Sequence, residues 1–229
     1  MSAKIITVAQ QKGGAGKTTI AAHLAVVLSQ KGERVAVIDI DSQQSLSRWH
    51  KVREEKFGEG YSGLNFSSLS GWRVNSEISS LNRKHDYIII DSPPHTETEA
   101  KTAIRASDIV VIPVQPSPTD LWATEATVDL AKKEKITSCL LLNRVSPNSK
   151  LAQIIEKKLP DTKVLKSRLG NRVAFASSLL EGKCVTETAP ASPAALEIKT
   201  LIKEITGLLD KDTELSERQD SAQKEPELA

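Results

Sequence analysis

Residues 12–19 read KGGAGKTT, and this stretch decides the fold. It follows the apolar run IITVA at residues 5–9 and precedes a run with helical periodicity at residues 20–30, so a buried strand here leads into a helix. The three glycines allow the backbone to curl with its N–H groups pointing inward, and the helix N-terminus adds partial positive charge at the same point. The stretch therefore predicts a loop that binds the phosphates of a nucleotide.

The loop carries two lysines with different expected tasks. Lys17 would reach the β- and γ-phosphates, and the hydroxyl of Thr18 would bind Mg²⁺. The common pattern G-x-x-x-x-G-K-[ST] has glycine where this chain has Gln11, and Lys12 follows as an additional cation. If Lys12 reaches the triphosphate bound by a second chain, the nucleotide holds a dimer together, and hydrolysis then loosens it. The alternative is that Lys12 only lies on the surface beside the loop.

Composition indicates an ordinary globular protein of one domain. The chain has 229 residues, of which 39% are hydrophobic and 26% charged, with a formal net charge of +2. Because this charge is small, binding to nucleic acid needs a local basic patch. The two cysteines, Cys139 and Cys184, are far apart in the sequence, which argues against a cysteine-bound metal or iron–sulfur cluster. The sequence has no signal peptide and no stretch of about 20 apolar residues, so we expect a soluble, cytoplasmic protein.

Apolar runs of strand length alternate with stretches of helical period, which is typical of a doubly wound α/β fold with a mostly parallel sheet and helices on both faces. The predicted strands cover residues 4–9, 34–39, 64–67, 87–91, 109–114, 138–143 and 163–166. The predicted helices cover residues 17–30, 44–53, 74–84, 96–106, 121–133, 150–158, 172–180 and 193–209. We expect one P-loop domain over residues 1–209 and an acidic, disordered tail over residues 210–229.

Acidic residues end two of the predicted strands. Asp39 and Asp41 close the second strand in VIDIDSQQS, and Asp91 closes the fourth in YIIIDSPP. Because ligands of open α/β sheets bind at the carboxyl edge of the strands, these carboxylates are expected beside the phosphate loop. There one carboxylate can orient or deprotonate the attacking water, and another can bind Mg²⁺. The alternative is that the aspartates only cap the following helix or terminate a strand.

These motifs together resemble the deviant Walker A ATPases of the ParA/MinD type, a group of P-loop NTPases. The resemblance rests on KGGAGKTT with its leading lysine, on VAVIDIDSQQSL and on YIIIDSPP. Three further segments are more similar to the small ParA partition ATPases than to MinD, namely SLSRW at residues 45–49, IPVQPSPTDLWA at residues 112–123 and GNRVAFASSLLEGKCV at residues 170–185. One departure is Ser42, which stands where the family usually has proline, so the local turn is expected to differ.

The resemblance implies a role for each motif residue. Lys12 would be the signature lysine that reaches the phosphates held by the partner subunit, and Asp41 would position or activate the hydrolytic water. Mg²⁺ would be held by Thr18 directly and by Asp91 through a water molecule, with Asp39 assisting. The remaining cofactor contacts are implied for Gly13, Gly14, Ala15, Gly16, Lys17, Thr19 and, facing the adenine, Asn143.

A basic surface in the C-terminal part of the chain is the second feature that the resemblance implies. The family binds double-stranded DNA there without reading its sequence, as contacts to phosphates alone would do. In this chain the basic cluster lies within residues 163–183. The expected DNA-binding residues are Lys166, Arg168, Arg172 and Lys183. The alternative is that these charges form an ordinary solvated face.

A membrane is the alternative partner of the C-terminal region. MinD-type proteins bind the bilayer through a basic amphipathic C-terminal helix, and residues 196–209 here also have an apolar helical face. However, Glu197, Glu204 and Asp210 dilute the basic residues, no aromatic side chain anchors the face, and an acidic tail follows. We therefore expect this helix to pack on the sheet and no membrane to bind.

The sequence thus predicts an Mg-dependent ATPase of the small ParA type without an N-terminal DNA-reading domain. It would form a homodimer with ATP, associate with the nucleoid, and be released when a ParB-like adaptor stimulates hydrolysis. A plasmid is the expected cargo, and the alternatives are a non-DNA cargo and a MinD-like membrane cycle. A nitrogenase-type iron protein would need paired bridging cysteines, and an inactive scaffold would be expected to lack Lys17, Asp41 or Asp91.

Overall fold

The computed structural model describes residues 2–58, 60, 62–94, 97–146, 149–158 and 162–222. The strands are β1 (Lys4–Val8), β2 (Val35–Asp39), β3 (Asn65–Ser68), β4 (Tyr87–Asp91), β5 (Ile109–Val114), β6 (Thr137–Val145) and β7 (Lys163–Gly170). They form one seven-stranded sheet in the order β3-β2-β4-β1-β5-β6-β7, and each neighbouring pair runs parallel.

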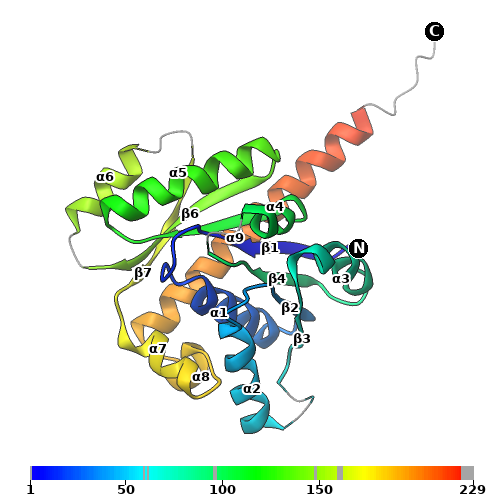
Figure 1. The fold of residues 1–229 in the computed structure, drawn as a ribbon, viewed down its shortest axis with the longest axis vertical. Helices are drawn as coiled ribbons and strands as arrows, with labels where there is room; N and C mark the ends of the chain where they lie inside the picture. The colour runs from blue at the N-terminus through cyan, green and yellow to red at the C-terminus, as the bar shows by residue number, and fades with distance from the viewer. Residues whose placement is uncertain are drawn as a thin grey trace.

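Helices cover both faces of this sheet (Figure 1). They are α1 (Lys17–Gln30), α2 (Ser45–Phe57), the 3-10 turn η1 (Gly71–Arg73), α3 (Val74–Leu81), α4 (Glu97–Arg105), α5 (Pro118–Lys133), α6 (Lys150–Lys158), α7 (Val173–Leu180), α8 (Val185–Thr188) and α9 (Pro193–Ala222). One core cluster joins α1, α2, α7, α8 and α9 to one face of the sheet, and two further clusters join α3, α4, α5 and α6 to the opposite face. The predicted doubly wound α/β fold is confirmed.

The central strands are apolar on both faces because helices bury both. In β4, which reads YIIID, every residue is buried; Ile88 and Ile90 face one side of the sheet, and Ile89 faces the other. The strands β1, β2 and β4 also end in register, since Asp91 pairs with Val8 on one side and with Asp39 on the other. The loop that leaves β1 therefore starts beside both carboxylates, at the carboxyl edge of the sheet.

The edge strand β7 is longer than its sequence pattern predicts: it continues to Gly170, whereas the prediction ended at Lys166. Carboxylates of α9 satisfy backbone N–H groups of this strand. Glu204 accepts from two successive N–H groups of β7 at 2.8 Å each, and Glu197 accepts from the N–H of Gly170 at 3.0 Å. These contacts cover the edge of the sheet and stabilise the longer strand. Because they come from α9, the sequence of β7 alone could not predict them.

The C-terminal helix α9 packs on the sheet, as predicted. Its apolar face contacts β7 and α1 and is buried through Ile198, Leu201, Ile202, Ile205 and Leu209. Within the described residues, no helix has the length and apolar character to cross a membrane. The helix continues to Ala222, and residues 210–222 contain no proline or glycine that would end it. The predicted domain boundary at residue 210 stays a prediction. Residues 223–229 of the predicted tail lie outside the described residues.

Candidate nucleotide-binding site

The phosphate loop lies between the end of β1 and the first turn of α1, and it has glycine where the backbone becomes left-handed. Gly14 has a φ of 76° and Gly16 a φ of 98°, which other residues rarely adopt. Glycine is needed at position 16 for a second reason, because a Cβ atom there would lie 2.4 Å from Nδ2 of Asn143. Asn143 donates a hydrogen bond to the carbonyl oxygen of Ala15 at 2.7 Å, so the end of β6 holds the loop in place.

Lys17 and Thr18 begin α1 beside a buried carboxylate. The hydroxyl of Thr18 donates to Oδ2 of Asp91 at 2.7 Å, and Lys17 is only 6% exposed. Burial lowers the pKa of Lys17, although the nearby Asp91 and Asp41 oppose this shift. Burial also raises the pKa of Asp91 to about 8, against the hydrogen bond from Thr18. Ionisable groups perturbed in this way are typical of sites that bind a charged ligand.

The surroundings of Asp91 fit a magnesium ion. Its Oδ1 is buried and has no hydrogen-bond partner among the described residues, an arrangement that is costly without a ligand. A hard cation next to the Thr18 hydroxyl would pair this oxygen, and a hydroxyl and a carboxylate are ligands that Mg²⁺ prefers. Thr18 and Asp91 are therefore the residues that would hold Mg²⁺. When bound, the ion neutralises charge on the β- and γ-phosphates.

Asp39 is buried and uses both carboxylate oxygens within the protein. Its Oδ1 accepts the N–H of Asp41 at 3.0 Å. Its Oδ2 accepts the N–H of Ser47 at 2.9 Å and the hydroxyl of Ser47 at 2.7 Å. Burial raises the pKa of Asp39, and the Ser47 hydrogen bonds partly offset the shift. Asp39 thus fixes the backbone of Asp41. That Asp39 also assists in binding Mg²⁺ stays a prediction.

The turn after Asp41, which contains Ser42, is closed by hydrogen bonds to Asp41 itself. Its carboxylate accepts the N–H of Gln43 at 2.9 Å, and its carbonyl oxygen accepts the N–H of Gln44 at 2.8 Å. Gln44 has a φ of 54°, in the left-handed region. Asp41 is half-buried and lines the same cavity as Lys17, so the position predicted for a water-orienting carboxylate lies beside the phosphate loop.

Lys12 forms an ion pair within its own chain. Its ammonium group contacts Oδ2 of Asp120 and donates to the hydroxyl of Thr119 at 3.0 Å, both in the first turn of α5. Asp120 is 1% exposed, and its Oδ1 has no hydrogen-bond partner in the part of the chain that the structure describes. Ser117 caps α5 by accepting the N–H of Asp120 at 3.1 Å. Lys12 thus has a defined partner, and its contact with a second chain stays a prediction.

Further hydrogen bonds fasten the segment between β5 and α5 to the phosphate loop. The amide of Gln115 donates to the carbonyl oxygen of Gly14 at 2.7 Å. Gln10, just before the loop, donates to the carbonyl oxygen of Pro113 at 3.2 Å and to the hydroxyl of Thr124 at 2.9 Å. These hydrogen bonds tie the position of the loop around Lys12 to that of β5 and the N-terminal half of α5.

Two adjoining cavities at the carboxyl edge match the two ends of a nucleotide. The first, of about 640 Å³, is lined by the phosphate loop and Asp41. The second, of about 270 Å³, lies between Asn143 and α7 and has Phe175 and Ile198 on its apolar wall. Both cavities are lined by Gly16, Thr19 and Arg144. The second cavity thus lies where the sequence predicts the adenine, and the contact of Asn143 with the base stays a prediction.

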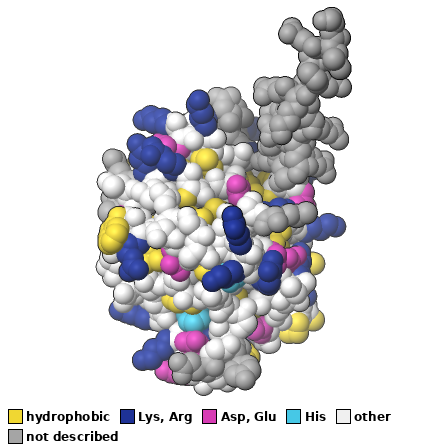
Figure 2. Space-filling model, turned by 90° about the vertical axis from the view of Figure 1, so that its right-hand side faces the viewer, with side chains coloured by type: hydrophobic (Ala, Val, Ile, Leu, Met, Phe, Trp, Pro, Cys, Tyr) yellow, Lys and Arg dark blue, Asp and Glu magenta, His cyan; other side chains and the backbone are white. Residues whose placement is uncertain are grey.

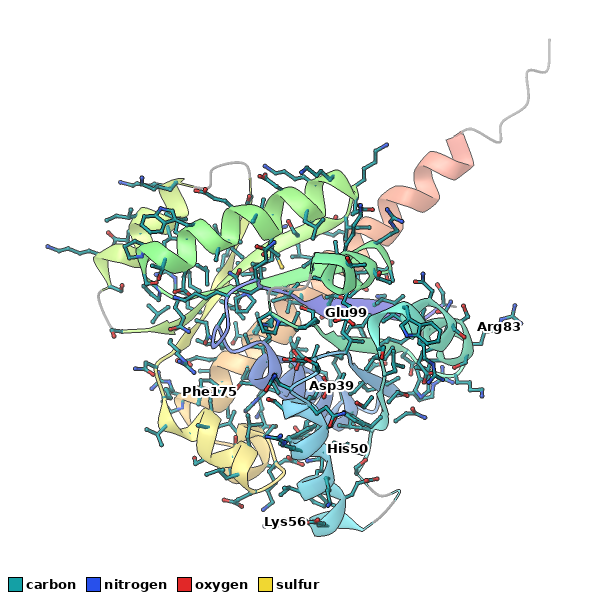
Figure 3. The ribbon with its side chains drawn as sticks, in the orientation of Figure 1. Asp39, His50, Lys56, Arg83, Glu99 and Phe175 are labelled. Atoms are coloured by element: carbon teal, nitrogen blue, oxygen red, sulfur yellow. The ribbon has the colours of Figure 1, made fainter. Side chains whose placement is uncertain are left out.

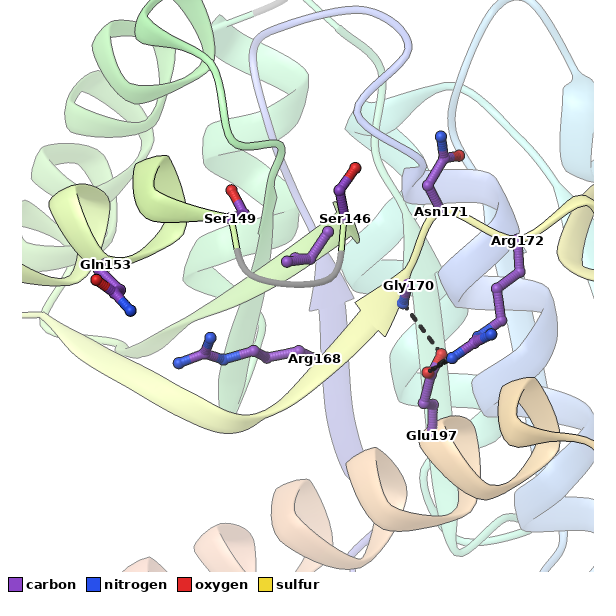
Figure 4. A pocket seen from close by; sticks show the side chains of 9 residues that line it. Ser146, Ser149, Gln153, Arg168, Gly170, Asn171, Arg172 and Glu197 are labelled. Atoms are coloured by element: carbon purple, nitrogen blue, oxygen red, sulfur yellow. Dashed lines mark hydrogen bonds and ion pairs between the residues drawn. The ribbon is translucent and has the colours of Figure 1, made fainter.

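Two of the predicted DNA-binding residues meet at a third cavity, of about 600 Å³, beside β7. Arg168 and Arg172 both line it, but they point in different directions (Figure 4). Arg172 turns toward α9 and pairs with Glu197 at 2.6 Å, which raises its pKa. Arg168 reaches along the cavity toward Gln153 of α6. Because Glu197 neutralises one of the two arginines, this cavity is less basic than the sequence suggests.

The other two predicted DNA-binding residues lie outside that cavity. Lys166 is exposed on β7. Lys183 lies on the turn between α7 and α8, is partly buried, and pairs with Glu181 at 3.4 Å. Figure 2 shows a different face, the side of the molecule that carries α3, where lysine and arginine side chains are scattered among acidic ones. DNA binding through these four residues stays a prediction.

Sequence reasoning missed three residues that shape the site. For Asp120 a signal exists, because the serine three residues earlier in SPTD is typical of a helix N-cap followed by an acid in the first turn. Ser47 carries no such signal, since its bond to Asp39 depends on how α2 is placed. Arg144 has a left-handed φ of 52°, held by a hydrogen bond from its N–H to Oδ1 of Asn143 at 2.9 Å.

Comparison with known proteins places the chain in a family. The family model "CobQ/CobB/MinD/ParA nucleotide binding domain" matches residues 6–185. The chain is 29% identical over 209 residues to the "Maintenance of carboxysome distribution protein A" of Halothiobacillus neapolitanus, covering 87% of this chain and 95% of that protein. It is 27% identical over 238 residues to the "Chromosome-partitioning ATPase Soj" of Thermus thermophilus, covering 87% and 94%.

Among solved structures, the fold is similar to that of the septum site-determining protein MinD of Pyrococcus horikoshii in complex with Mg-ADP. The TM-score is 0.74 at 21% identity, over 90% of this chain and 98% of that one. The family match of residues 6–185 includes the phosphate loop, Asp41, Asp91 and Asn143. The chain therefore belongs to the CobQ/CobB/MinD/ParA nucleotide-binding family and is an ATPase of the ParA/MinD type.

Proposed function

We propose that this ATPase is a nucleotide-operated dimer switch that positions a cargo on the nucleoid. ATP and Mg²⁺ bind, two chains associate, the dimer binds DNA without reading its sequence, and stimulated hydrolysis releases it. The observation that carries this proposal is the second lysine of the phosphate loop, Lys12, which Asp120 holds beside the nucleotide site. A loop that only bound a nucleotide within one chain would need Lys17 alone.

The geometry of the ion pair supports a reversible switch. The side chain of Lys12 is 36% exposed, whereas that of Asp120 is 1% exposed. Lys12 can therefore turn toward another anion with little loss of packing, and a triphosphate carries several negative charges. When Lys12 leaves, Ser117 and the N-terminus of α5 still stabilise the charge of Asp120. In this switch, Lys12 exchanges the carboxylate of Asp120 in its own chain for the nucleotide bound by the second chain.

Within one subunit, the chain's own groups perform hydrolysis. Lys17 binds the β- and γ-phosphates, and Thr18 and Asp91 hold the metal end of the nucleotide. Asp41, which lines the same cavity as Lys17, orients the attacking water. Asp39 accepts the N–H of Asp41 and so fixes the backbone from which the water-orienting carboxylate projects.

Packing of the C-terminal helix favours DNA over a membrane as the surface partner. The apolar face of α9 that a bilayer would need is buried in the core. In contrast, Lys166 and Arg168 are exposed on β7 and face the same side of the strand as the cavity beside α6. Phosphates bound there require charge but no base-specific groups. We therefore propose non-specific DNA binding and nucleoid association, with the MinD-like membrane cycle as the less supported alternative.

The cargo depends on an adaptor protein that binds it and stimulates hydrolysis, in the manner of ParB. One relative is named for chromosome partitioning, which supports a DNA cargo such as the predicted plasmid. Another is named for the maintenance of carboxysome distribution, and 95% of its length aligns with this chain, which supports a non-DNA cargo equally well. We therefore propose cargo positioning as the function and retain both cargo classes.

Phosphate release with Mg-ATP, with and without random duplex DNA, and the mass in solution with ATP together test the proposal. We expect hydrolysis to depend on Mg²⁺, and the Lys12→Ala variant to bind ATP but to lose dimerisation and any stimulation by DNA. Lys31→Ala, a change of an exposed lysine at the end of α1, serves as the matched control. Full dimerisation of Lys12→Ala with ATP would refute the switch.

A further inference from the structure

The first turn of α2 is attached to the nucleotide site through Asp39. Gln44 stands at the N-cap position and makes no side-chain cap. Instead, Asp39 reaches over from the end of β2 and accepts both the N–H and the hydroxyl of Ser47, at 2.9 Å and 2.7 Å. The same carboxylate accepts the N–H of Asp41 at 3.0 Å. One buried group therefore fixes both the start of α2 and the backbone of Asp41.

Farther along α2, Arg53 attaches the helix to the turn between α7 and α8. This arginine is only 6% exposed. Its guanidinium donates to Glu187 through Nη1 at 2.9 Å and Nη2 at 3.0 Å, and Nη1 also donates to the carbonyl oxygen of Gly182 at 3.1 Å. Nε donates to the carbonyl oxygen of Ser62 at 2.8 Å. Such a two-pronged, buried contact has a defined geometry that lysine cannot reproduce.

The turn between α7 and α8 lies directly against the backbone of α2. Gly182 has a φ of 65°, and a Cβ atom there would lie 2.4 Å from the backbone nitrogen of Arg53. Trp49, one turn earlier on α2, donates from Nε1 to the carbonyl oxygen of Lys183 at 3.3 Å. Because no space separates the two backbones at Gly182, a displacement of the turn must displace α2.

The same turn is connected to the nucleoside side of the site. Phe175 of α7 lines the smaller cavity, and Leu180 at the end of α7 lines the larger one. From the other side, the N–H of Val185 donates to Nε2 of His23 at 3.1 Å, on the helix that follows the phosphate loop. The α7–α8 turn thus contacts α1 and α2 at once, and side chains of α7 line both cavities.

We propose that Ser47 and Arg53 are positioning residues for ATP hydrolysis. Ser47 holds the start of α2 at Asp39, and Arg53 holds the helix farther along at the turn between α7 and α8. The position of α7 then determines, through α2, where the backbone of Asp41 lies. The inference rests on the proposed role of Asp41 in orienting water. Figure 3 shows Asp39 at the start of α2, with His50 and Lys56 farther along the helix, and Phe175 on the neighbouring α7. Among the described residues that line the phosphate-loop cavity, neither Ser47 nor Arg53 is found.

This arrangement separates binding of ATP from its hydrolysis. Loss of the Ser47 hydroxyl leaves the phosphate loop and Lys17 unchanged, so the affinity for ATP is retained. It removes one of the two Ser47 hydrogen bonds to Asp39, which loosens the link between α2 and the Asp41 backbone. The reaction step that depends on the placement of Asp41 then slows, and kcat falls while KM stays constant.

Steady-state hydrolysis of Mg-ATP by Ser47→Ala tests the first attachment point. We expect kcat to fall on the order of tenfold, the size of effect that a lost hydrogen bond to a charged group produces, with KM within about twofold of the wild type. Ser47→Thr keeps the hydroxyl and is expected to restore kcat. Ser79→Ala, where the hydroxyl donates only to the carbonyl oxygen of Asn75 in its own helix, is the matched control.

Arg53→Lys tests the second attachment point, with circular dichroism to confirm folding. We expect its kcat to fall at unchanged KM, and the double variant Ser47→Ala/Arg53→Lys to be little slower than the slower single variant, because both changes interrupt one connection. A merely structural role of Arg53 would lower the melting temperature and leave kcat of the folded protein unchanged.

An unchanged kcat in Ser47→Ala, or independent multiplication of the two effects in the double variant, would overturn the inference. The outcome is separable from that of the proposed dimer switch. Failure of the switch would appear as ATP-dependent dimerisation of Lys12→Ala, whereas failure of this inference appears only in the kcat of variants that keep Lys12. Both measurements use the full chain with Mg-ATP.

Discussion

Lys12 in the phosphate loop is paired with Asp120, a buried carboxylate 108 residues later in the chain. The pair joins the loop to the first turn of α5. In it, Asp120 binds the lysine that is proposed to reach the nucleotide of a second chain. In the proposed switch, dimerisation requires Lys12 to leave one anion for another. The free energy of this exchange sets how much ATP is needed to form the dimer.

Asp120→Asn is expected to promote dimerisation with ATP. Asparagine keeps the size of the side chain but removes the charge that competes for Lys12. We predict that the ATP concentration for half-maximal dimer formation falls on the order of tenfold, or about 1.4 kcal/mol. Light scattering during an ATP titration measures this, with the exposed Asp129→Asn of the same helix as control. An equal or higher ATP requirement would speak against the exchange.

Asp91→Asn separates the metal site from the fold. The carboxylate of Asp91 is buried, and one of its oxygens has no hydrogen-bond partner within the residues that the structure describes, so the neutral amide is expected to leave the apo protein at least as stable as the wild type. The extra rise in melting temperature that Mg²⁺ gives beyond ATP alone is expected to disappear. Thermal unfolding with ATP, with and without Mg²⁺, measures both effects. If Mg²⁺ still raised the melting temperature of the ATP-bound variant, the metal would bind at another position.

His23 makes the stability of the fold sensitive to acid. Its Nδ1 lies 2.7 Å from the carbonyl oxygen of Thr19 and its Nε2 accepts the N–H of Val185, so the buried ring is neutral. Burial lowers the pKa of His23 to about 4, although Thr19 and Glu187 oppose the shift. Because the unfolded chain binds a proton near pH 6.5, stability from this group is complete above that pH and falls between about pH 6.5 and 4.

The expected loss is roughly 3 kcal/mol over this pH range, measured by urea unfolding at several pH values. His50, whose pKa burial also lowers, contributes in the same direction. His23→Gln is expected to flatten the pH dependence. Equal slopes for His23→Gln and the wild type would show that other groups cause the acid sensitivity.

Arg168→Glu is expected to weaken binding of the ATP-bound protein to random duplex DNA. Loss of one phosphate contact reduces the slope of log K for DNA binding against log salt concentration by about one. It also weakens binding to all DNA sequences equally. Fluorescence anisotropy over a range of salt concentrations gives both quantities. Arg83→Glu reverses an exposed charge beyond α3, at the opposite end of the sheet from β7, and is the matched control (Figure 3). Equal losses for both variants would indicate a net-charge effect and no defined patch.

Local patterns were sufficient for the phosphate loop, the Asp91 strand end and the packing of α9, because each depends on periodicity or on the rules of parallel sheets. They were insufficient for Lys12 with Asp120 and for Arg53 with Glu187. These partners are 108 and 134 residues apart, and no spacing rule relates them. Asp39 illustrates the same limit, since its strand position was predictable but its bond to Ser47 depends on where α2 lies.

The mass in solution of the Asp41→Ala variant, in which hydrolysis is expected to be slow enough to keep ATP bound, tests the dimer switch most directly. One chain has a mass of 24.9 kDa. We predict the mass of two chains for Asp41→Ala with Mg-ATP, and of one chain with Mg-ADP. The double variant Lys12→Ala/Asp41→Ala is predicted to bind ATP and remain a single chain. A double variant that forms the dimer with Mg-ATP would contradict the proposed role of Lys12.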